Sequence, residues 1–341
     1  MNVNDTCAII SMMKHEHDFI NQWIEYHIKI GFSHFYLLID NLTDKQSDYI
    51  IEDNFKGTVT LIDCNPKILH KHWGDSVDKF RKAEHHESYF MQYLLNVELI
   101  ESNIITEHWV TAIGIDQFIY LNGNTIQEYI KTIDESCTQV IMPWSICAFN
   151  NKNICYDNLM ENVHLYSGHY NGTKGHSNGL IRTSNLRKIS GDSHHFISKR
   201  PEQKVYIIDE YFTMPANLQT QKIFEICHTK LQKIPLNMLT ISSFHIMLRN
   251  VNEAFVKEFA YWGKNNMDSM INNISNNTID YHGRLSLLRG LDTMPVLNII
   301  SPKLAIMNKR THYEYILEKL LEKHNISLDR FYKWVTNTIL I

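Results

Sequence analysis

Hydrophobic and polar residues follow two different periods along the first half of the chain. Residues 6–13 form a short apolar run that predicts a buried strand, and apolar residues then recur at helical spacing from Phe19 to Ile28, where Gly31 follows. The same reading predicts strands over residues 34–40, 58–62, 108–113 and 139–142, and helices over residues 44–53 and around 90–95. Strands and helices that alternate with such long crossovers predict an α/β fold with a mostly parallel sheet and flanking helices.

The pattern changes beyond residue 150. Residues 150–198 are richer in Gly, Asn, Ser and His, which predicts irregular structure over a site. The final part of the chain has helical spacing again, for example around Leu320 and Val335. We therefore expect two domains, an α/β domain over residues 1–265 and a helical C-terminal extension over residues 266–341.

Composition excludes several classes of protein. The formal net charge is -4, so no basic excess is available to follow a nucleic-acid backbone, and nucleic acid is not an expected partner. No apolar run reaches the roughly 18 residues of a membrane span. The first residues lack the pattern of a signal peptide, so we expect a cytoplasmic protein, with peripheral membrane association left open. The six cysteines include no C-x-x-C pair, which argues against a zinc site and a disulfide framework.

Candidate site residues follow the predicted strands. Ligands of parallel sheets bind outside the carboxyl ends of the strands, so the polar residues at these points are the first to consider. They are residues 14–16, Asp40 with Asn41, and Asp116 with Gln117. Two of these have a structural alternative, since Asp116 could cap a strand end and Asp40 with Asn41 could turn the chain.

The N-terminal segment resembles a known family. Residues 14–27 read KHEHDFINQWIEYH, residues 30–36 read IGFSHFY, and residues 39–41 read IDN. This order resembles the opening of glycosyltransferase family 92 and its relatives in the family 2-like clan. Those proteins begin with Lys-x-Glu, a Glu-Trp-x-x-x-His helix, a turn and strand, and Asp-Asn.

Further segments resemble the same family in the same order, up to about residue 260. They are residues 85–89, 109–118, 143–149, 174–182, 194–196 and 243–255. The resemblance implies a GT-A-like fold and transfer of a sugar from a nucleotide-sugar donor, expected to be a UDP-sugar, to a glycan hydroxyl with inversion. The C-terminal tail has no match.

The resemblance also implies a divalent metal ion. Mn²⁺ or Mg²⁺ stabilises the charge that develops on a leaving diphosphate. By position, Asp116 and His245 are the metal ligands, with diphosphate oxygens and water filling the remaining sites. Residues expected to contact donor or acceptor are Lys14, Glu16, Asp40, Asn41, Trp144, Lys174, Arg182, His195 and Arg249. For Trp144, core packing is an equal alternative, and Lys174 and Arg249 could be surface cations.

Inversion requires a carboxylate base near the acceptor. The candidates are Glu161, Asp192, Asp209 and Glu210, and the sequence does not choose among them.

The chain departs from the family at one motif. The Asp-x-Asp-Glu of the family is here Gly114-Ile115-Asp116-Gln117, so two of three carboxylates are missing. A catalytically inactive relative that binds nucleotide or glycan is therefore an alternative. A His-rich metal hydrolase is a weaker one, because the dense His and Asp motifs of two-metal sites are absent.

Overall fold

The computed structural model describes residues 6–13, 15–17, 19–39, 49, 51–63, 100, 103–149, 163–166, 177–189, 195–215, 220–231, 239–248, 264–276, 296–297 and 312–338. The chain forms two compact units. One is built from residues 1–145 and 169–245, and the other from residues 146–168 and 246–341. The predicted domains, residues 1–265 and 266–341, stay a prediction.

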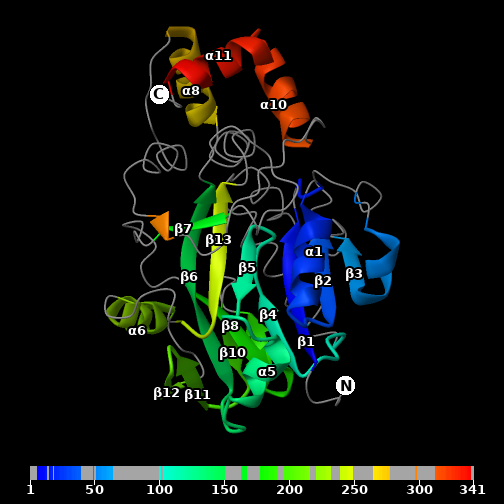
Figure 1. Ribbon diagram of the computed structural model, residues 1–341, viewed down its shortest axis with the longest axis vertical. Coiled ribbons are helices and arrows are strands. Elements are labelled where there is room, and N and C mark those ends of the chain that lie inside the picture. The colour runs from blue at the N-terminus through cyan, green and yellow to red at the C-terminus, as the bar shows by residue number, and fades with distance from the viewer. Residues whose placement is uncertain are drawn as a thin grey trace, which may run out of the picture. The chain divides into compact units, whose positions relative to one another are not determined.

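A mixed sheet of parallel and antiparallel pairs forms the centre of the first unit (Figure 1). Its strands lie in the order β12-β11-β6-β8-β4-β1-β2-β3. Neighbouring strands are parallel except that β8 is antiparallel to β4 and β6, and β12 is antiparallel to β11. The strands are β1 (Cys7–Met13), β2 (His34–Ile39), β3 (Val59–Asp63), β4 (Trp109–Ala112), β6 (Gln139–Phe149), β8 (Ser177–Arg182), β11 (Glu202–Ile207) and β12 (Glu210–Pro215).

These strands confirm the α/β class and the five strands predicted from the sequence, although β6 runs on to Phe149. The helices predicted over residues 44–53 and around 90–95 lie largely outside the described residues. Within the described part, residues Asp53–Thr58 form a 3-10 helix, η3, instead.

Alternate residues of a strand point to opposite faces of the sheet, and buried side chains cover both faces. On one face, Phe35 of β2 contacts the Trp23 ring of helix α1 (Ile20–Lys29), with ring centroids 5.6 Å apart. On the other face, Ile10 and Ile181 belong to a buried cluster that includes Phe196. Helix α6 (Thr220–Leu231) buries a second apolar cluster against β6 and β11.

Helix α1 forms where the sequence predicts a helix. Its buried residues Ile20, Trp23, Ile24 and His27 recur at the i, i+3, i+4, i+7 spacing of one helix face. The helix ends because Gly31 takes a φ of 104°, a left-handed conformation that side chains disfavour, and its N–H donates to the Ile28 carbonyl at 2.9 Å.

A second ladder lies beside the central sheet. Strand β5 (Gln117–Tyr120) pairs antiparallel with β13 (Ser242–Leu248), and the register sets Gln117 opposite His245 and Tyr120 opposite Ser242. The helix that follows β5, α5 (Ile126–Lys131), begins at a capping box formed by Thr125 and Glu128.

The prediction of irregular structure over residues 150–198 is wrong for its second half. There β8 is a central strand, and β9 (Leu186–Ile189) pairs antiparallel with β10 (Phe196–Ser198). The Gly and Asn residues of β8 have a packing role. A Cβ atom on Gly179 would lie 3.1 Å from Gln139 Nε2 and 3.2 Å from Phe196 Cδ2, so this central position suits glycine.

The second unit contains the predicted C-terminal helices. They are α8 (Lys264–Asn276), α10 (His312–Glu322) and α11 (Leu328–Thr338). Between α10 and α11 the Ile326 N–H donates to the Leu321 carbonyl at 3.1 Å, and Phe331 is buried. The unit also includes β7 (Val163–Tyr166), which pairs with the end of β6 and with β14 (Val296–Leu297).

Candidate functional site

The strand order of the central sheet reverses at β1. From β1 the chain passes to β2 and then β3 on one side, whereas β4 lies on the other side of β1. In open α/β sheets, ligands bind at such a switch point, outside the carboxyl ends of the two strands. Here residues 15–17 follow β1 and residues 113–116 follow β4, so these two segments border the candidate site.

Glu16 lies in the first of these segments and is buried. Its carbonyl accepts hydrogen bonds from the N–H groups of Phe19 and Ile20, both at 3.1 Å, and so joins the segment to the start of α1. Its own N–H donates to the Tyr49 hydroxyl at 3.3 Å, and the Tyr49 ring stacks on His17 with centroids 4.2 Å apart. The structure therefore fixes Glu16 at the edge where the sequence predicted a donor contact.

The second segment is a tight turn between β4 and β5. The Gln117 N–H donates to the Gly114 carbonyl at 3.0 Å, and the Gly114 N–H donates to Gln117 Oε1 at 3.2 Å. Gln117 is buried, with 2% of its surface exposed. At the two positions where the family has carboxylates, this chain thus has a glycine and a glutamine that close the turn on each other.

Asp116 occupies the space that the missing side chain of Gly114 leaves. A Cβ atom on Gly114 would lie 2.6 Å from Asp116 Oδ1, closer than real atoms approach. The backbone of Gly114 lies outside the left-handed region, so this conflict is one of space and not of φ. The carboxylate of Asp116 can therefore lie where it does only because residue 114 lacks a side chain.

The ladder between β5 and β13 brings the backbone of His245 close to that of Asp116. They are more than a hundred residues apart in sequence, yet His245 is the register partner of Gln117, the residue directly after Asp116. Residues directly opposite in an antiparallel ladder have Cα atoms about 4.5–5.5 Å apart. Asp116 directly precedes this ladder and His245 belongs to it, so their backbones are close, and their assignment to one metal ion stays a prediction.

Trp144 and His195 lie at the same edge of the sheet. The Trp144 indole N–H donates to Asn178 Oδ1, and Asn178 Nδ2 donates to the Ala112 carbonyl at the end of β4, at 3.0 Å. The hydroxyl of Ser177, the residue before Asn178 in β8, lies 2.9 Å from His195 Nε2. Asn178, which is fully buried, is not among the residues predicted from the sequence; an amide inside a short strand, directly before Gly179, is the signal that could have identified it.

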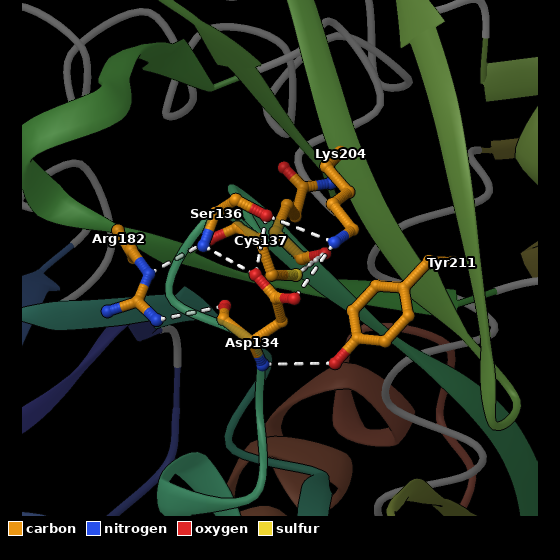
Figure 2. A network of polar contacts seen from close by, with 7 residues as sticks. Asp134, Ser136, Cys137, Arg182, Lys204 and Tyr211 are labelled. Carbon is orange, nitrogen blue, oxygen red and sulfur yellow. Dashed lines mark hydrogen bonds and ion pairs between the residues drawn. The ribbon is translucent and has the colours of Figure 1, made fainter.

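Arg182 is not brought to this edge. It pairs with Trp109, at the start of β4, and so lies at the amino end of the strand whose carboxyl end precedes Asp116. Its Nε donates to the Cys137 carbonyl at 2.9 Å (Figure 2). Its guanidinium also lies 4.3 Å from the centroid of the Trp109 ring.

The surroundings of Arg182 form a polar network at the amino edge (Figure 2). The Asp134 carboxylate accepts hydrogen bonds from Ser136 and, at 3.0 Å, from the Lys204 ammonium. These bonds to Ser136 and then to Lys204 lower the pKa of the Asp134 carboxyl to about 2. The Asp134 N–H also donates to the Tyr211 hydroxyl at 3.0 Å. These bonds connect the segment before β6 with β8, β11 and β12.

Two of the four candidate bases belong to described residues. Asp209 lies in the tight turn after β11, with a φ of 63°, and its Oδ1 accepts hydrogen bonds from the Tyr206 and Thr240 hydroxyls at 3.1 and 3.2 Å. Glu210 forms an ion pair with Lys230 at 2.5 Å. Strands β8 and β6 separate β11 from β4, which sets them roughly 14 Å apart at the usual strand spacing. The base assignment stays a prediction.

The remaining candidates lie outside the described residues. They are Lys14, Asp40, Asn41, Glu161, Lys174, Asp192 and Arg249. His245 is described by its backbone alone.

Asp116 and His245 stay the predicted ligands of a metal ion. Among the residues that the structure describes, no group of three or more His, Cys, Asp or Glu side chains could hold an ion. Mg²⁺ at nucleotide sites is commonly held by one or two carboxylates together with substrate phosphates, not by an all-protein cage, and Mn²⁺ also accepts imidazole. One carboxylate, one imidazole and a diphosphate would supply a donor set of that kind.

Comparison with known proteins finds little similarity. No family model and no curated protein matches the chain. One solved structure that is similar, the apo form of mouse xyloside xylosyltransferase 1, has a TM-score of 0.25 and 9% sequence identity. The match covers 40% of this chain and 53% of the transferase, so the chain spans about half the length of that protein. A TM-score this low supports no inference about fold or function.

None of the helices in the described part of the chain is long and apolar enough to cross a membrane.

Proposed function

We propose that this chain is a glycosyltransferase that transfers a sugar from a nucleotide-diphosphate donor, with a UDP-sugar as the first candidate, to a glycan hydroxyl. The observation that carries the proposal is the register of β5 and β13, which sets Asp116 beside the partner of His245. The ordered sequence resemblance to family 92 and its relatives assigns these same two residues to one metal ion.

The position of the other candidates supports the proposal. Glu16, Trp144 and His195 come from segments far apart in sequence, and all three lie at the carboxyl edge of the sheet that carries Asp116. In an α/β sheet that edge is where ligands bind. The proposed donor site comprises these residues and excludes Arg182, whose guanidinium bonds to the amino edge.

Asp116 and His245 would hold the ion. When bound, a divalent cation offsets the negative charge that develops on the leaving diphosphate. The buried Asn178 would set the Trp144 indole beside the end of β4, where it could stack on a sugar or base. Inversion and the identity of the base rest on the sequence resemblance alone.

A panel of UDP-, GDP- and dTDP-sugars, scored for nucleotide release with Mn²⁺ and with EDTA, tests the proposal. We expect metal-dependent release from a UDP-sugar that an added glycan acceptor increases. Purified protein that binds none of the nucleotides and releases none of them would contradict it.

A second candidate is a nucleotide- or glycan-binding protein without turnover. The turn between Gly114 and Gln117 favours it, because both residues serve the backbone at positions where the family has carboxylates. A thermal shift with UDP and Mn²⁺, without nucleotide release from any sugar of the panel, would select this candidate.

A further inference from the structure

Strand β5 has one edge in the ladder with β13, and α1 covers the other edge. Gln117 and Ile119 turn their backbone polar groups toward the helix. The Gln117 carbonyl accepts from Trp23 Nε1 at 2.8 Å, the Ile119 carbonyl accepts from the Tyr26 hydroxyl at 2.8 Å, and the Ile119 N–H donates to His27 Nε2 at 3.3 Å. The fourth group, the Gln117 N–H, bonds to Gly114. All four groups on this edge are therefore paired.

The three side chains come from one face of the helix, because positions i, i+3 and i+4 lie side by side. Each replaces a hydrogen bond that a neighbouring strand would otherwise make. Trp23, Tyr26 and His27, called here the α1 clamp, thus hold a strand of only four residues that pairs with β13 on its other side.

The geometry fixes the clamp in one protonation state. The Trp23 carbonyl can only accept, so the His27 Nδ1 at 2.8 Å carries the proton, and Nε2 is left to accept from Ile119. His27 is fully buried, and its ring lies 4.6 Å from that of Trp23 and 5.7 Å from that of Phe118. Burial lowers the pKa of His27 to about 3, so the imidazole is neutral at neutral pH.

We infer that Trp23, Tyr26 and His27 are positioning residues for the proposed metal site. Asp116 directly precedes β5, and His245 is the register partner of its first residue, so any slip of β5 changes the separation of the two ligands. The clamp prevents that slip from the edge opposite β13. The inference rests on the proposed function, since it assigns the clamp a role in holding the donor metal.

The test compares three variants. His27→Phe keeps an aromatic ring in the core but loses both hydrogen bonds, and His27→Gln retains a donor and an acceptor. Ile24→Ala is the matched control, because Ile24 is equally buried on α1 and is not part of the clamp. For each variant, thermal stability, the Mn²⁺ dissociation constant in the presence of UDP, and amide hydrogen exchange of residues 114–120 and 7–13 are measured.

We expect His27→Phe to weaken Mn²⁺ binding by about tenfold or more, as loss of an outer-shell partner does, and His27→Gln to recover much of it. Exchange of residues 114–120 should accelerate by about tenfold while residues 7–13 stay protected. Ile24→Ala should lower stability and change Mn²⁺ affinity less than about twofold.

Equal effects of His27→Phe and Ile24→Ala on Mn²⁺ affinity, or on exchange of the two segments, would overturn the inference. If wild-type protein binds no Mn²⁺ with UDP, the proposed function fails. Selective exchange of residues 114–120 in His27→Phe would then still establish the clamp on β5, and uniform exchange would remove it as well.

Discussion

The position of the Asp116 carboxylate depends on Gly114 and Gln117. Gln117 Oε1 accepts from the Gly114 N–H, and Asp116 Oδ1 fills the space beside Gly114, so the turn is built around a single carboxylate. A chain with Asp at position 114 would need the Asp116 carboxylate to rotate away. The turn is thus filled by one carboxylate and one amide side chain.

This arrangement yields a prediction with an internal control. Gly114→Ala adds only a Cβ atom, which displaces the Asp116 carboxylate, so we expect Mn²⁺ binding with UDP to weaken by about tenfold. Gly114→Asp with Gln117→Glu also adds two ligand-type carboxylates, and should bind Mn²⁺ more tightly than wild type. Isothermal titration measures both. Tighter binding by Gly114→Ala, or no gain in the double variant, would show that the ion uses other ligands.

At this scale the sequence does not predict contacts between side chains and distant elements. The Trp-x-x-x-His spacing of α1 resembles a family motif. The bonds from these two side chains to β5 depend on which strand packs against the helix, and no local pattern encodes that. Asn178 was missed for the same reason, since its two partners come from β4 and β6.

The contact between helix α1 and strand β5 makes the stability of the fold depend on pH, because it buries His27. The pKa of an unperturbed His is about 6.5, and burial lowers the pKa of His27 to about 3 in the fold. Between these values the unfolded chain binds a proton that the folded chain excludes. The free energy of unfolding therefore falls as pH is lowered through this window, by up to about 1.4 kcal/mol per pH unit, and the full stability is present above about pH 6.5.

The second prediction follows from this linkage. His27→Phe cannot titrate, so its free energy of unfolding should fall less steeply than that of wild type between about pH 6 and pH 4, by close to one proton. Urea unfolding at stepped pH measures the slope, and Thr213→Ala, which changes no titratable group at an exposed position of β12, should leave it unchanged. Parallel slopes for wild type and His27→Phe would mean that His27 is not held neutral.

At the carboxyl edge, the buried Asn178 amide connects β4 to β6. Asn178→Ala removes the bonds to the Trp144 indole and the Ala112 carbonyl, and we expect the free energy of unfolding to fall by about 1–3 kcal/mol. Thr213→Ala, at an exposed position of β12, should stay within about 0.5 kcal/mol of wild type. Denaturant titration compares them, and equal stabilities would show that Asn178 does not couple β4 to β6.

Element boundaries were predictable where the hydrophobic period is clear, as for β1, β2 and α1. They were not predictable where tertiary packing overrides composition. Strand β8 carries Ser, Asn and Gly, which are typical of loops, and is a strand because its neighbours β4 and β6 supply hydrogen bonds on both edges. Strand β5 was not predicted, because four residues are too few to show the alternation of hydrophobic and polar positions.

Across the whole first unit, the two edges of the sheet have different roles. The amino edge carries Arg182, Asp134 and Lys204 in bonds to one another and to the backbone, and the carboxyl edge carries the proposed site. The sequence resemblance predicted a donor contact for Arg182 because order along the chain does not distinguish a strand that runs antiparallel. In β8 the last residue, Arg182, lies at the edge opposite the proposed site.

A variant of Arg182 therefore separates stability from binding. Arg182→Ala loses a hydrogen bond to Cys137 and the contact with the Trp109 ring, so we expect a loss of about 1 kcal/mol in the free energy of unfolding. Mn²⁺ affinity in the presence of UDP should stay within about twofold of wild type. A large loss of affinity with unchanged stability would return Arg182 to the donor site.

The central claim is that Asp116 and His245 share one ion with the donor diphosphate. Pulsed electron paramagnetic resonance of Mn²⁺ bound with UDP tests it most directly, because it detects nitrogen and phosphorus nuclei that couple to the ion. We predict both couplings in wild type, loss of the nitrogen coupling alone in His245→Ala, loss of bound Mn²⁺ in Asp116→Ala, and no change in His324→Ala. A nitrogen coupling that persists in His245→Ala, or Mn²⁺ that binds Asp116→Ala as tightly as wild type, would contradict the claim.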